Sequence, residues 1–339
     1  MTLSPRRFSV APMMEWTDRH CRYFLRLLSK HTLLYTEMIT TGALLKGDAP
    51  RFLRFDPFEH PVAIQLGGSE PTEMARAARM AEDAGYDEVN MNVGCPSDRV
   101  QSGRFGACLM AEPQLVADCV AAMRAAVTIP ITIKTRIGID RDESTDRLYA
   151  LVEAVQVTGC ESFTIHARKA WLDGLSPKEN RELPPLCYPV VYQLKRDYPN
   201  LEINLNGGVT TLEAAHHHLR EIDGVMIGRE AYHNPYMLVG VDAAIFDAED
   251  ERMAPREEII ERFKPYISRQ LAAGNTLHSM TRHILGLYQG MRGSRAWRRV
   301  LSNDVHRAGA NLAVLNRALS HVIDNREFDE DEAIATTQA

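Results

Sequence analysis

The chain has 339 residues, of which 45% are hydrophobic and 25% are charged, and its formal net charge at pH 7 is -6. This length and apolar content allow a large core in one big domain or two ordinary ones, and the net charge gives no overall sign of nucleic-acid binding. The six cysteines include no C-x-x-C pair, and neither a signal-peptide start nor a membrane-length apolar run is present, which excludes a disulfide framework and a membrane span. We therefore expect a cytoplasmic protein with reduced thiols.

Eight short apolar runs recur along the first part of the chain, and each is followed by a helical pattern. Strands that alternate with helices predict βαβ units and a parallel sheet. Eight units in about 235 residues fit the usual size of a (β/α)8 TIM barrel. The expected strands are residues 8–11, 33–36, 62–66, 88–92, 131–134, 162–166, 202–206 and 224–227.

A doubly wound open sheet is the alternative arrangement for such a pattern. It favours a G-x-G-x-x-G turn after the first strand, and the residues 12–15 that follow the first strand here are Pro-Met-Met-Glu. The pattern therefore favours the barrel.

The pattern changes after the eighth strand, because only helical periodicity follows an acidic break at residues 247–251. Helices are expected at 255–274, 277–289, 294–308 and 311–325. We therefore predict a catalytic barrel at residues 1–245, a small all-α domain at 246–326 and a disordered acidic tail at 327–339.

The stretch 88–97 predicts a short strand that ends abruptly and delivers a thiol. Val89 and Met91 alternate with Asn90 and Asn92, and Gly94 and Pro96 then end the strand around Cys95. The polar, glycine-rich and cationic loop that follows is typical of a ligand-binding loop.

Polar residues or glycines stand at the carboxyl ends of all eight expected strands, where barrels of this kind carry their active sites. The ends of strands seven and eight place bare amides and a guanidinium beside helix N-termini, which indicates a phosphate cradle that FMN would fit. Lys134 could stabilise a reduced flavin anion. His166 taken alone fits a buried core histidine better than a ligand-binding one. The cradle residues are Asn206, Gly207, Gly208, Gly228 and Arg229.

No metal site is expected, because the consecutive histidines 216–218 lie on a helix and face different directions. A basic surface is expected in the helical domain instead. Between residues 282 and 307 there are six arginines, one acid and no lysine, with Tyr288 and Trp297 interleaved. Arg295, Arg298 and Arg299 share one helix face, and arginine without lysine suits a bidentate grip on phosphate.

Taken together, the motifs resemble those of the tRNA-dihydrouridine synthases, A-type branch, over nearly the whole chain. One small departure is Glu15, where the family has Asp. The matching stretches are residues 11–14 and 16–19, 92–97, 103–110, 134–140, 166–170, 175–181, 206–208, 226–230 and 293–299.

The resemblance implies a role for each matching residue. Cys95 would be the catalytic acid, and no metal would take part. FMN would be held by Pro12, Met13, Met14, Gln65, Lys134, His166, Asn206, Gly207, Gly208, Gly228 and Arg229. Contacts with tRNA would come from Asn92, Lys178, Arg181, Arg295 and Arg298.

The implied reaction is reduction of the C5=C6 bond of D-loop uridines, at positions 20 and 20a, to 5,6-dihydrouridine. NADPH (or NADH) would reduce FMN, hydride would pass from flavin N5 to uracil C6, and Cys95 would protonate C5. We expect a monomer that acts on tRNA and does not associate with a membrane. The alternatives are an FMN-dependent barrel reductase of a free pyrimidine or small enone, a non-catalytic RNA-binding module and a phosphosugar isomerase.

Overall fold

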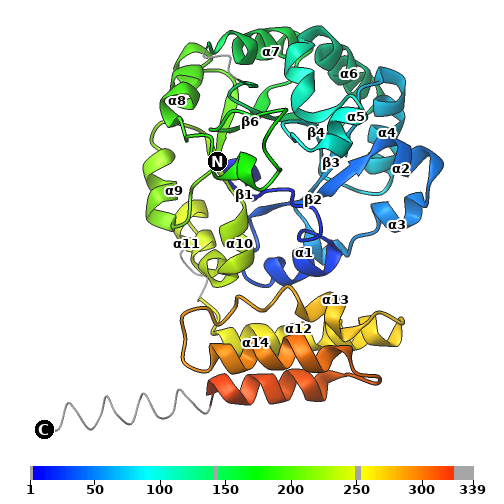
Figure 1. The fold of residues 1–339 in the computed structure, drawn as a ribbon, viewed down its shortest axis with the longest axis vertical. Helices are drawn as coiled ribbons and strands as arrows, with labels where there is room; N and C mark the ends of the chain where they lie inside the picture. The colour runs from blue at the N-terminus through cyan, green and yellow to red at the C-terminus, as the bar shows by residue number, and fades with distance from the viewer. Residues whose placement is uncertain (1–2, 141–143, 249–252, 324–339) are drawn as a thin grey trace, which may run out of the picture. The chain divides into compact units, whose positions relative to one another are not determined.

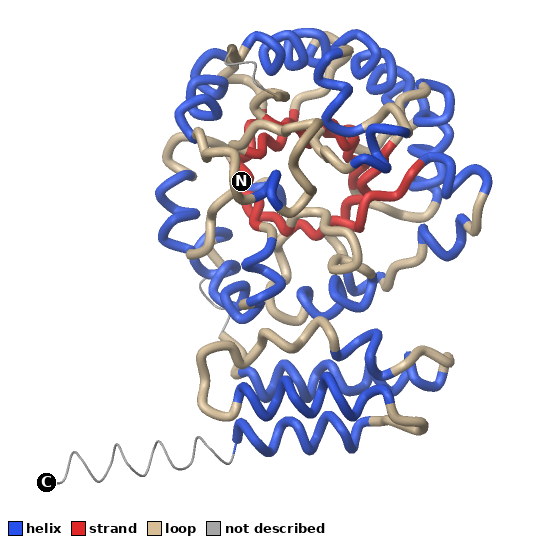
Figure 2. Tube along the Cα trace, in the orientation of Figure 1, coloured by secondary structure: helices blue, strands red, loops and turns tan. Residues whose placement is uncertain are grey.

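The computed structural model describes residues 3–140, 144–248 and 253–323. Within these residues, eight parallel strands close into a barrel in the order β1 to β8, with β8 pairing back onto β1. Figure 2 shows the strands as a ring enclosed by helices. The strands are β1 (Phe8–Val10), β2 (Leu33–Thr40), β3 (Val62–Gly67), β4 (Glu88–Val93), β5 (Ile131–Arg136), β6 (Ser162–His166), β7 (Glu202–Asn206) and β8 (Gly224–Ile227).

Helices follow the strands around the outside of the barrel (Figure 1), so the TIM-barrel prediction is confirmed. Short 3-10 turns complete the loops, at Pro5–Arg7, Pro57–Glu59, Gly106–Ala111 and Glu179–Arg181. The barrel helices are α2 (Thr41–Lys46), α3 (Ala49–Leu53), α4 (Pro71–Asp83), α5 (Asp98–Ser102), α6 (Pro113–Ala126), α7 (Asp146–Gln156), α8 (Tyr188–Asp197) and α9 (Leu212–His218).

Helix α4 illustrates how local sequence sets these elements. The Glu70 side chain accepts hydrogen bonds from the first backbone amides, and Pro71 occupies a position where no amide hydrogen is needed. One face of the helix, with Met74 and Ala78, is completely buried. Burial of this apolar stripe holds the helix against the sheet.

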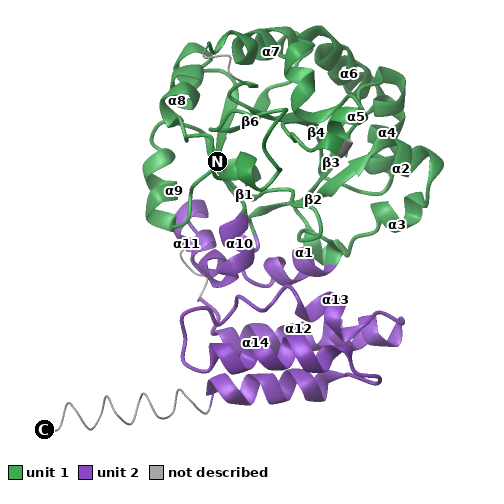
Figure 3. Cartoon of the chain, viewed as in Figure 1, with its two compact units in different colours: residues 1–19, 31–228 green, residues 20–30, 229–339 purple. Residues whose placement is uncertain are grey.

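The chain divides into two compact units, Met1–Arg19 with His31–Gly228, and His20–Lys30 with Arg229–Ala339 (Figure 3). The second unit is helical and takes in the segment after β1, whereas the sequence suggested a boundary at residues 245 and 246. Its elements are α1 (Arg19–Arg26), α10 (Arg229–His233), a 3-10 turn (Pro235–Gly240), α11 (Val241–Phe246), α12 (Arg256–Ala272), α13 (Leu277–Thr281), α14 (Ser294–Asn303), a 3-10 turn (Asp304–His306) and a helix at 312–323.

Aromatic packing explains why residues 20–30 belong to the helical unit. The rings of Tyr23 and Tyr266 stack with centroids 3.8 Å apart, and Phe24 lies 5.5 Å from Phe263. The Ser29 hydroxyl donates a hydrogen bond to Asp242 at 2.5 Å. These contacts are long-range in sequence and tie α1 to α11 and α12.

The expected helix at 277–289 is wrong in length, because α13 ends at Thr281 and turns follow. Within these turns, a Cβ atom at Gly286 would lie 2.2 Å from the carbonyl oxygen of His233, so the close approach of the two backbones requires glycine there. The expected tail at 327–339 lies outside the described residues.

Candidate active site

The loop after β4 holds Cys95 at the carboxyl end of the barrel. The Asn92 side-chain oxygen accepts hydrogen bonds from the backbone amides of Gly94 at 3.1 Å and Cys95 at 2.9 Å. The Cys95 carbonyl accepts from the Ala107 amide at 2.9 Å. The half-buried thiol donates to the Ser97 hydroxyl at 3.5 Å. The backbone of Cys95 is therefore fixed on both sides while its sulfur stays accessible.

Lys134 and Asn206 meet on the neighbouring part of the same rim. The Lys134 ammonium donates a hydrogen bond to the Asn206 side-chain oxygen at 3.1 Å, and the Asn206 amide donates to the Met226 carbonyl at 2.8 Å. In the strand register, Lys134 pairs with Asn92 and His166 pairs with Asn206. Strands β4 to β8 therefore bring these side chains to one edge.

Burial lowers the pKa of Lys134 to about 7, with a further lowering by Arg136 that Cys95 partly opposes. Burial also lowers the pKa of His166 well below its usual range, and the cations Arg136 and Lys134 add to this shift. His166 is therefore neutral at physiological pH, and Lys134 is easily converted between its charged and neutral forms.

Gly207 and Gly208 leave a bare backbone beside His166. Both glycines have positive φ angles, 112° and 76°. A Cβ atom on Gly207 would lie 2.7 Å from the His166 ring, and one on Gly208 would lie 2.5 Å from both Leu186 and the Tyr188 hydroxyl. Only glycine fits these positions without displacing a neighbour.

Arg136 braces two loops at the mouth, a role that the sequence analysis did not assign. Its Nε donates to the Gly94 carbonyl at 2.9 Å, and its Nη1 donates to the carbonyls of Lys169 at 2.9 Å and Asn180 at 3.0 Å. The Cys95 loop and the long loop after β6 are thereby joined through one buried guanidinium. The available signal for this role was an arginine at the carboxyl end of a predicted strand.

Comparison with known proteins decides the family. The family model described as dihydrouridine synthase (Dus) matches residues 9–324. A tRNA-dihydrouridine(20/20a) synthase of Pseudomonas aeruginosa is 62% identical over 93% of this chain and 94% of that protein. Proteins with the same name from Vibrio vulnificus and Escherichia coli K12 are 60% and 59% identical, over 93% and 94% of this chain and 97% and 92% of theirs.

The chain belongs to the dihydrouridine synthase family. This confirms the resemblance drawn from the motifs and makes the protein an oxidoreductase that acts on a CH–CH bond. Among solved structures, a 2-naphthoyl-CoA reductase in complex with 2-naphthoyl-CoA aligns with a TM-score of 0.53 at 11% identity, over 69% of this chain and 49% of that one. At this identity the likeness concerns the fold alone.

Dihydrouridine synthases depend on a flavin, and the residues of the mouth fit such a group. Gly207 and Gly208 carry no side chains, so their backbone stays at least partly exposed beside His166. At Gly228 a Cβ atom would lie 3.9 Å from the nearest atoms, on Ala11 and Met13. A cation at Lys134 adds the charge that a reduced flavin needs. Shape and charge are thus both suited to a flavin.

The remaining cofactor candidates are spread more widely. Pro12 and Met13 are half-buried after β1, while Met14 is 58% exposed. Gln65 is buried inside the barrel and accepts a hydrogen bond from Asn92 at 2.8 Å. Arg229 is exposed and begins α10 in the second unit.

The tRNA candidates other than Asn92 are all exposed. Lys178 and Arg181 lie in the loop after β6, and Arg295 and Arg298 lie on α14. The interleaved aromatics behave differently, because Tyr288 and Trp297 are completely buried and pack edge to face with centroids 4.9 Å apart. They form the core beneath the arginines and offer no surface for stacking.

Among the described residues, no group of three or more His, Cys, Asp or Glu side chains could hold a metal ion. Instead, His218 shares a 2.6 Å hydrogen bond with Tyr192. No helix in the described ranges has the length and apolar character to cross a membrane.

The lowered pKa of Lys134 predicts a pH dependence of stability. The unfolded chain binds this proton up to about pH 10.5, while the folded protein releases it near pH 7. Between these values the unfolded state holds more protons, so Lys134 makes the folded state more stable as pH rises from 7 to 10. Lys134→Met should therefore be more stable than the parent below pH 7, and its advantage should shrink at higher pH. Urea unfolding of flavin-free protein at several pH values measures the difference, and a pH-independent gap contradicts it.

Proposed function

We propose that this protein reduces uridines 20 and 20a in the D loop of tRNA to 5,6-dihydrouridine, with FMN as its flavin and NADPH as reductant. The observation that carries the proposal is the identity of about 60%, over more than nine-tenths of the chain, with proteins named tRNA-dihydrouridine(20/20a) synthase. Because tRNA is the substrate, we place the protein in the cytoplasm. We also propose that it acts as a monomer.

In this proposal the mouth of the barrel receives a uridine extruded from the tRNA, since its C5=C6 bond cannot be reached in a stacked base. Bound FMN, once reduced by NADPH, would supply the hydride for uracil C6. The thiol of Cys95 donates its proton to C5, which breaks the S–H bond and forms the C5–H bond. The thiolate then takes a proton from solvent. The fixed backbone around Cys95 supports this role, because it holds the sulfur in one place.

The proposed flavin site combines the glycines with the side chains beside them. Gly207 and Gly208 present backbone next to His166, and Asn206 orients the Lys134 ammonium. FMN would be held by these residues with Pro12, Met13, Met14, Gln65, Gly228 and Arg229. The proposed tRNA contacts are Asn92, Lys178, Arg181, Arg295 and Arg298.

The direct test incubates the purified protein with unmodified tRNA and NADPH and maps dihydrouridine by position. We expect conversion at 20 and 20a, and none of free uridine or uracil at the same concentration. Conversion of free pyrimidine that tRNA does not compete with favours a small-molecule reductase instead. A purified protein without flavin absorbance contradicts the proposal at its first step.

Gly207→Ala should reduce the flavin bound per protein by about tenfold, because the new methyl group must displace His166. Gly174→Ala is the matched control, since Gly174 also has a positive φ, 81°, but no atom within 4 Å of the added Cβ. Both variants carry the strain of about 1 kcal/mol for this backbone conformation. Equal flavin loss in both variants, measured by absorbance, would point to backbone strain and away from a flavin site at Gly207.

A further inference from the structure

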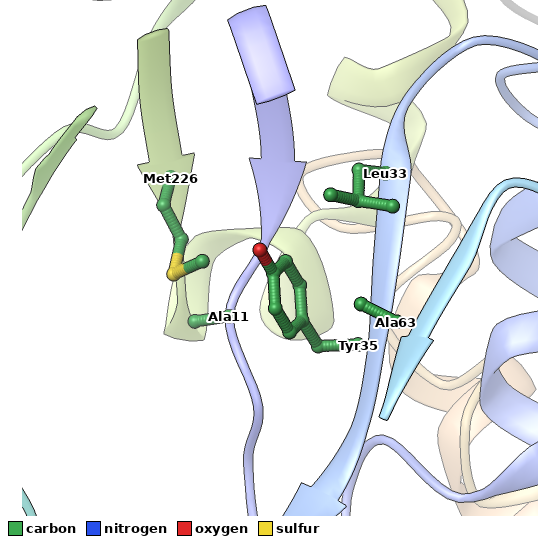
Figure 4. Close-up of a cluster of buried hydrophobic side chains, with 5 residues drawn as sticks. All are labelled: Ala11, Leu33, Tyr35, Ala63 and Met226. Atoms are coloured by element: carbon green, nitrogen blue, oxygen red, sulfur yellow. The ribbon is translucent and has the colours of Figure 1, made fainter. Parts of the chain in front are cut away.

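A buried carboxylate stands at the opposite end of β4 from the Cys95 loop. Glu88, with a side chain only 3% exposed, accepts from the Arg6 guanidinium at 2.6 Å. It also accepts from the Tyr35 hydroxyl at 2.8 Å and the Thr132 hydroxyl at 2.6 Å. Figure 4 shows Tyr35 among side chains from neighbouring strands. Burial and the Glu88 charge raise the pKa of Tyr35 well above its usual value, so it remains a donor.

From Thr132 a chain of side-chain hydrogen bonds leads to the catalytic loop. The Asn90 amide donates to the Thr132 hydroxyl at 2.9 Å, the Gln65 amide donates to Asn90 at 2.8 Å, and the Asn92 amide donates to Gln65 at 2.8 Å. The Asn92 oxygen then accepts from the Cys95 amide. All four side chains are buried. This unbroken series of hydrogen bonds therefore connects Glu88, at the start of β4, with the Cys95 loop at its end.

The groups at its two ends fix which partner donates and which accepts in each hydrogen bond of this series. A carboxylate paired with arginine can only accept, so Thr132 gives its one hydroxyl hydrogen to Glu88 and must accept from Asn90. Backbone amides can only donate, so Asn92 must turn its oxygen toward Gly94 and Cys95. Each amide in between has one orientation that satisfies both neighbours, and reversing one leaves two donors or two acceptors facing each other.

We propose that Glu88 is a positioning residue of the active site, which acts through Thr132, Asn90 and Gln65 to hold Asn92 in one orientation and thereby fix the Cys95 loop. This inference rests on the proposed function for its catalytic consequence. Its structural part, the anchoring of the loop, can be tested without turnover.

One consequence concerns what Asn92 offers to a ligand. Its oxygen already accepts from two backbone amides, and one of its N–H groups is donated to Gln65. The remaining N–H is the group that this side chain, 8% exposed, can present. Asn92 is therefore a donor that matches a carbonyl oxygen of uracil and not the N3–H of that base.

Glu88→Gln tests the anchor, because a neutral amide can donate as well as accept and no longer imposes a direction. Glu202→Gln is the matched control. Glu202 also accepts from Arg6, at 2.9 Å, but it is not part of the series of hydrogen bonds that leads to Asn92. We expect kcat to fall at least about tenfold in Glu88→Gln, because misplacement of reacting groups is costly. The KM for tRNA should stay within about twofold, since phosphate contacts dominate tRNA affinity. Glu202→Gln should match the parent in both constants.

A second pair of variants cuts the chain and leaves the ion pair intact. Thr132→Val removes the hydroxyl that joins Asn90 to Glu88, and Thr132→Ser restores it. The readout is amide hydrogen exchange of the flavin-loaded protein in a peptide covering residues 93–97, with a peptide over β7 as the internal reference. Thr132→Val should exchange about tenfold faster at 93–97 alone, and Thr132→Ser should match the parent.

The outcomes separate the two levels of the argument. Unchanged exchange at 93–97 in Thr132→Val overturns the anchoring, whether or not the parent modifies tRNA, and equal kcat losses in Glu88→Gln and Glu202→Gln overturn the role of Glu88. If Glu88→Gln fails to fold, the Thr132 pair decides through the same exchange and kcat measurements. A parent that makes no dihydrouridine but shows the expected exchange pattern contradicts the proposed function and supports the anchored loop.

Discussion

Cys95→Ala should bind flavin as the parent does and consume NADPH in the first half of the reaction, yet form dihydrouridine about a hundred- to ten-thousand-fold more slowly. That range is the usual contribution of a positioned general acid. The thiol is the side chain that the β4 loop delivers, with its backbone bonded to Asn92 and Ala107. The flavin candidates at Lys134, Asn206 and Gly207 do not include Cys95, so its removal should leave the cofactor in place.

Two further variants separate proton donation from packing. Cys95→Ser keeps the shape of the side chain but replaces the thiol by a far weaker acid, so it should be nearly as slow as Cys95→Ala. Cys108→Ala, in the loop that follows, removes a thiol that donates to the nearby Phe105 carbonyl at 3.2 Å, and should stay within about twofold of the parent. Stopped-flow measurement of both half-reactions provides the comparison. Full dihydrouridine formation by Cys95→Ala removes the thiol from the mechanism.

The barrel was predictable because its strands are short apolar runs separated by amphipathic helices. All eight strands begin at the residues expected. Their ends were harder to predict, as β2 shows, since it continues past the expected end at Thr36 to Thr40. Its register against β3 shifts between Tyr35 and Met38, and such an irregularity admits the polar Glu37 into the strand. A polar residue in a strand was misread as the end of that strand.

The division of the chain into compact units was harder to predict from the sequence, because it depends on packing between segments that are far apart along the chain. Residues 20–30 follow β1 directly and were counted with the barrel, but Tyr23 and Phe24 pack on aromatic residues some 240 positions later. A helical pattern records which face of α1 is apolar and not what covers that face. The boundaries of the compact units were therefore harder to predict than the fold class.

The rim of the candidate site followed from the barrel rule, which places the carboxyl ends of the strands together. Lys134 with Asn206, and His166 with Gly207, are neighbours as that rule requires. The buried polar side chains beneath the rim could not be predicted from the sequence, since Glu88 begins a strand and resembles an ordinary exposed acid. Its partner Arg6 lies 82 positions away in another turn. Side-chain hydrogen bonds between strands inside a barrel can be predicted only when the strand register is known, and the structure supplies that register.

Arg295→Ala combined with Arg298→Ala should weaken tRNA binding by on the order of tenfold at low salt and lower the slope of log K against log salt by about 2. Helix α14 turns Trp297, Val300 and Leu301 inward, and both arginines are exposed on the outer side. Neither pairs with a carboxylate in the part of the chain that the structure describes. Their charges are therefore available for phosphate.

The salt dependence is what distinguishes phosphate contacts from general damage to the helical unit. Each phosphate contact that is lost releases one counterion fewer, so the slope changes with the number of contacts, whereas unfolding of the unit removes binding at every salt concentration. Arg262→Ala, which removes one exposed arginine on α12 outside the arginine-rich segment, controls for loss of positive charge elsewhere on the helical unit and should leave the slope unaltered. Binding is measured by filter retention at several salt concentrations. If the double variant keeps the parent's affinity and slope, Arg295 and Arg298 do not contact tRNA phosphates, and this part of the proposal is wrong.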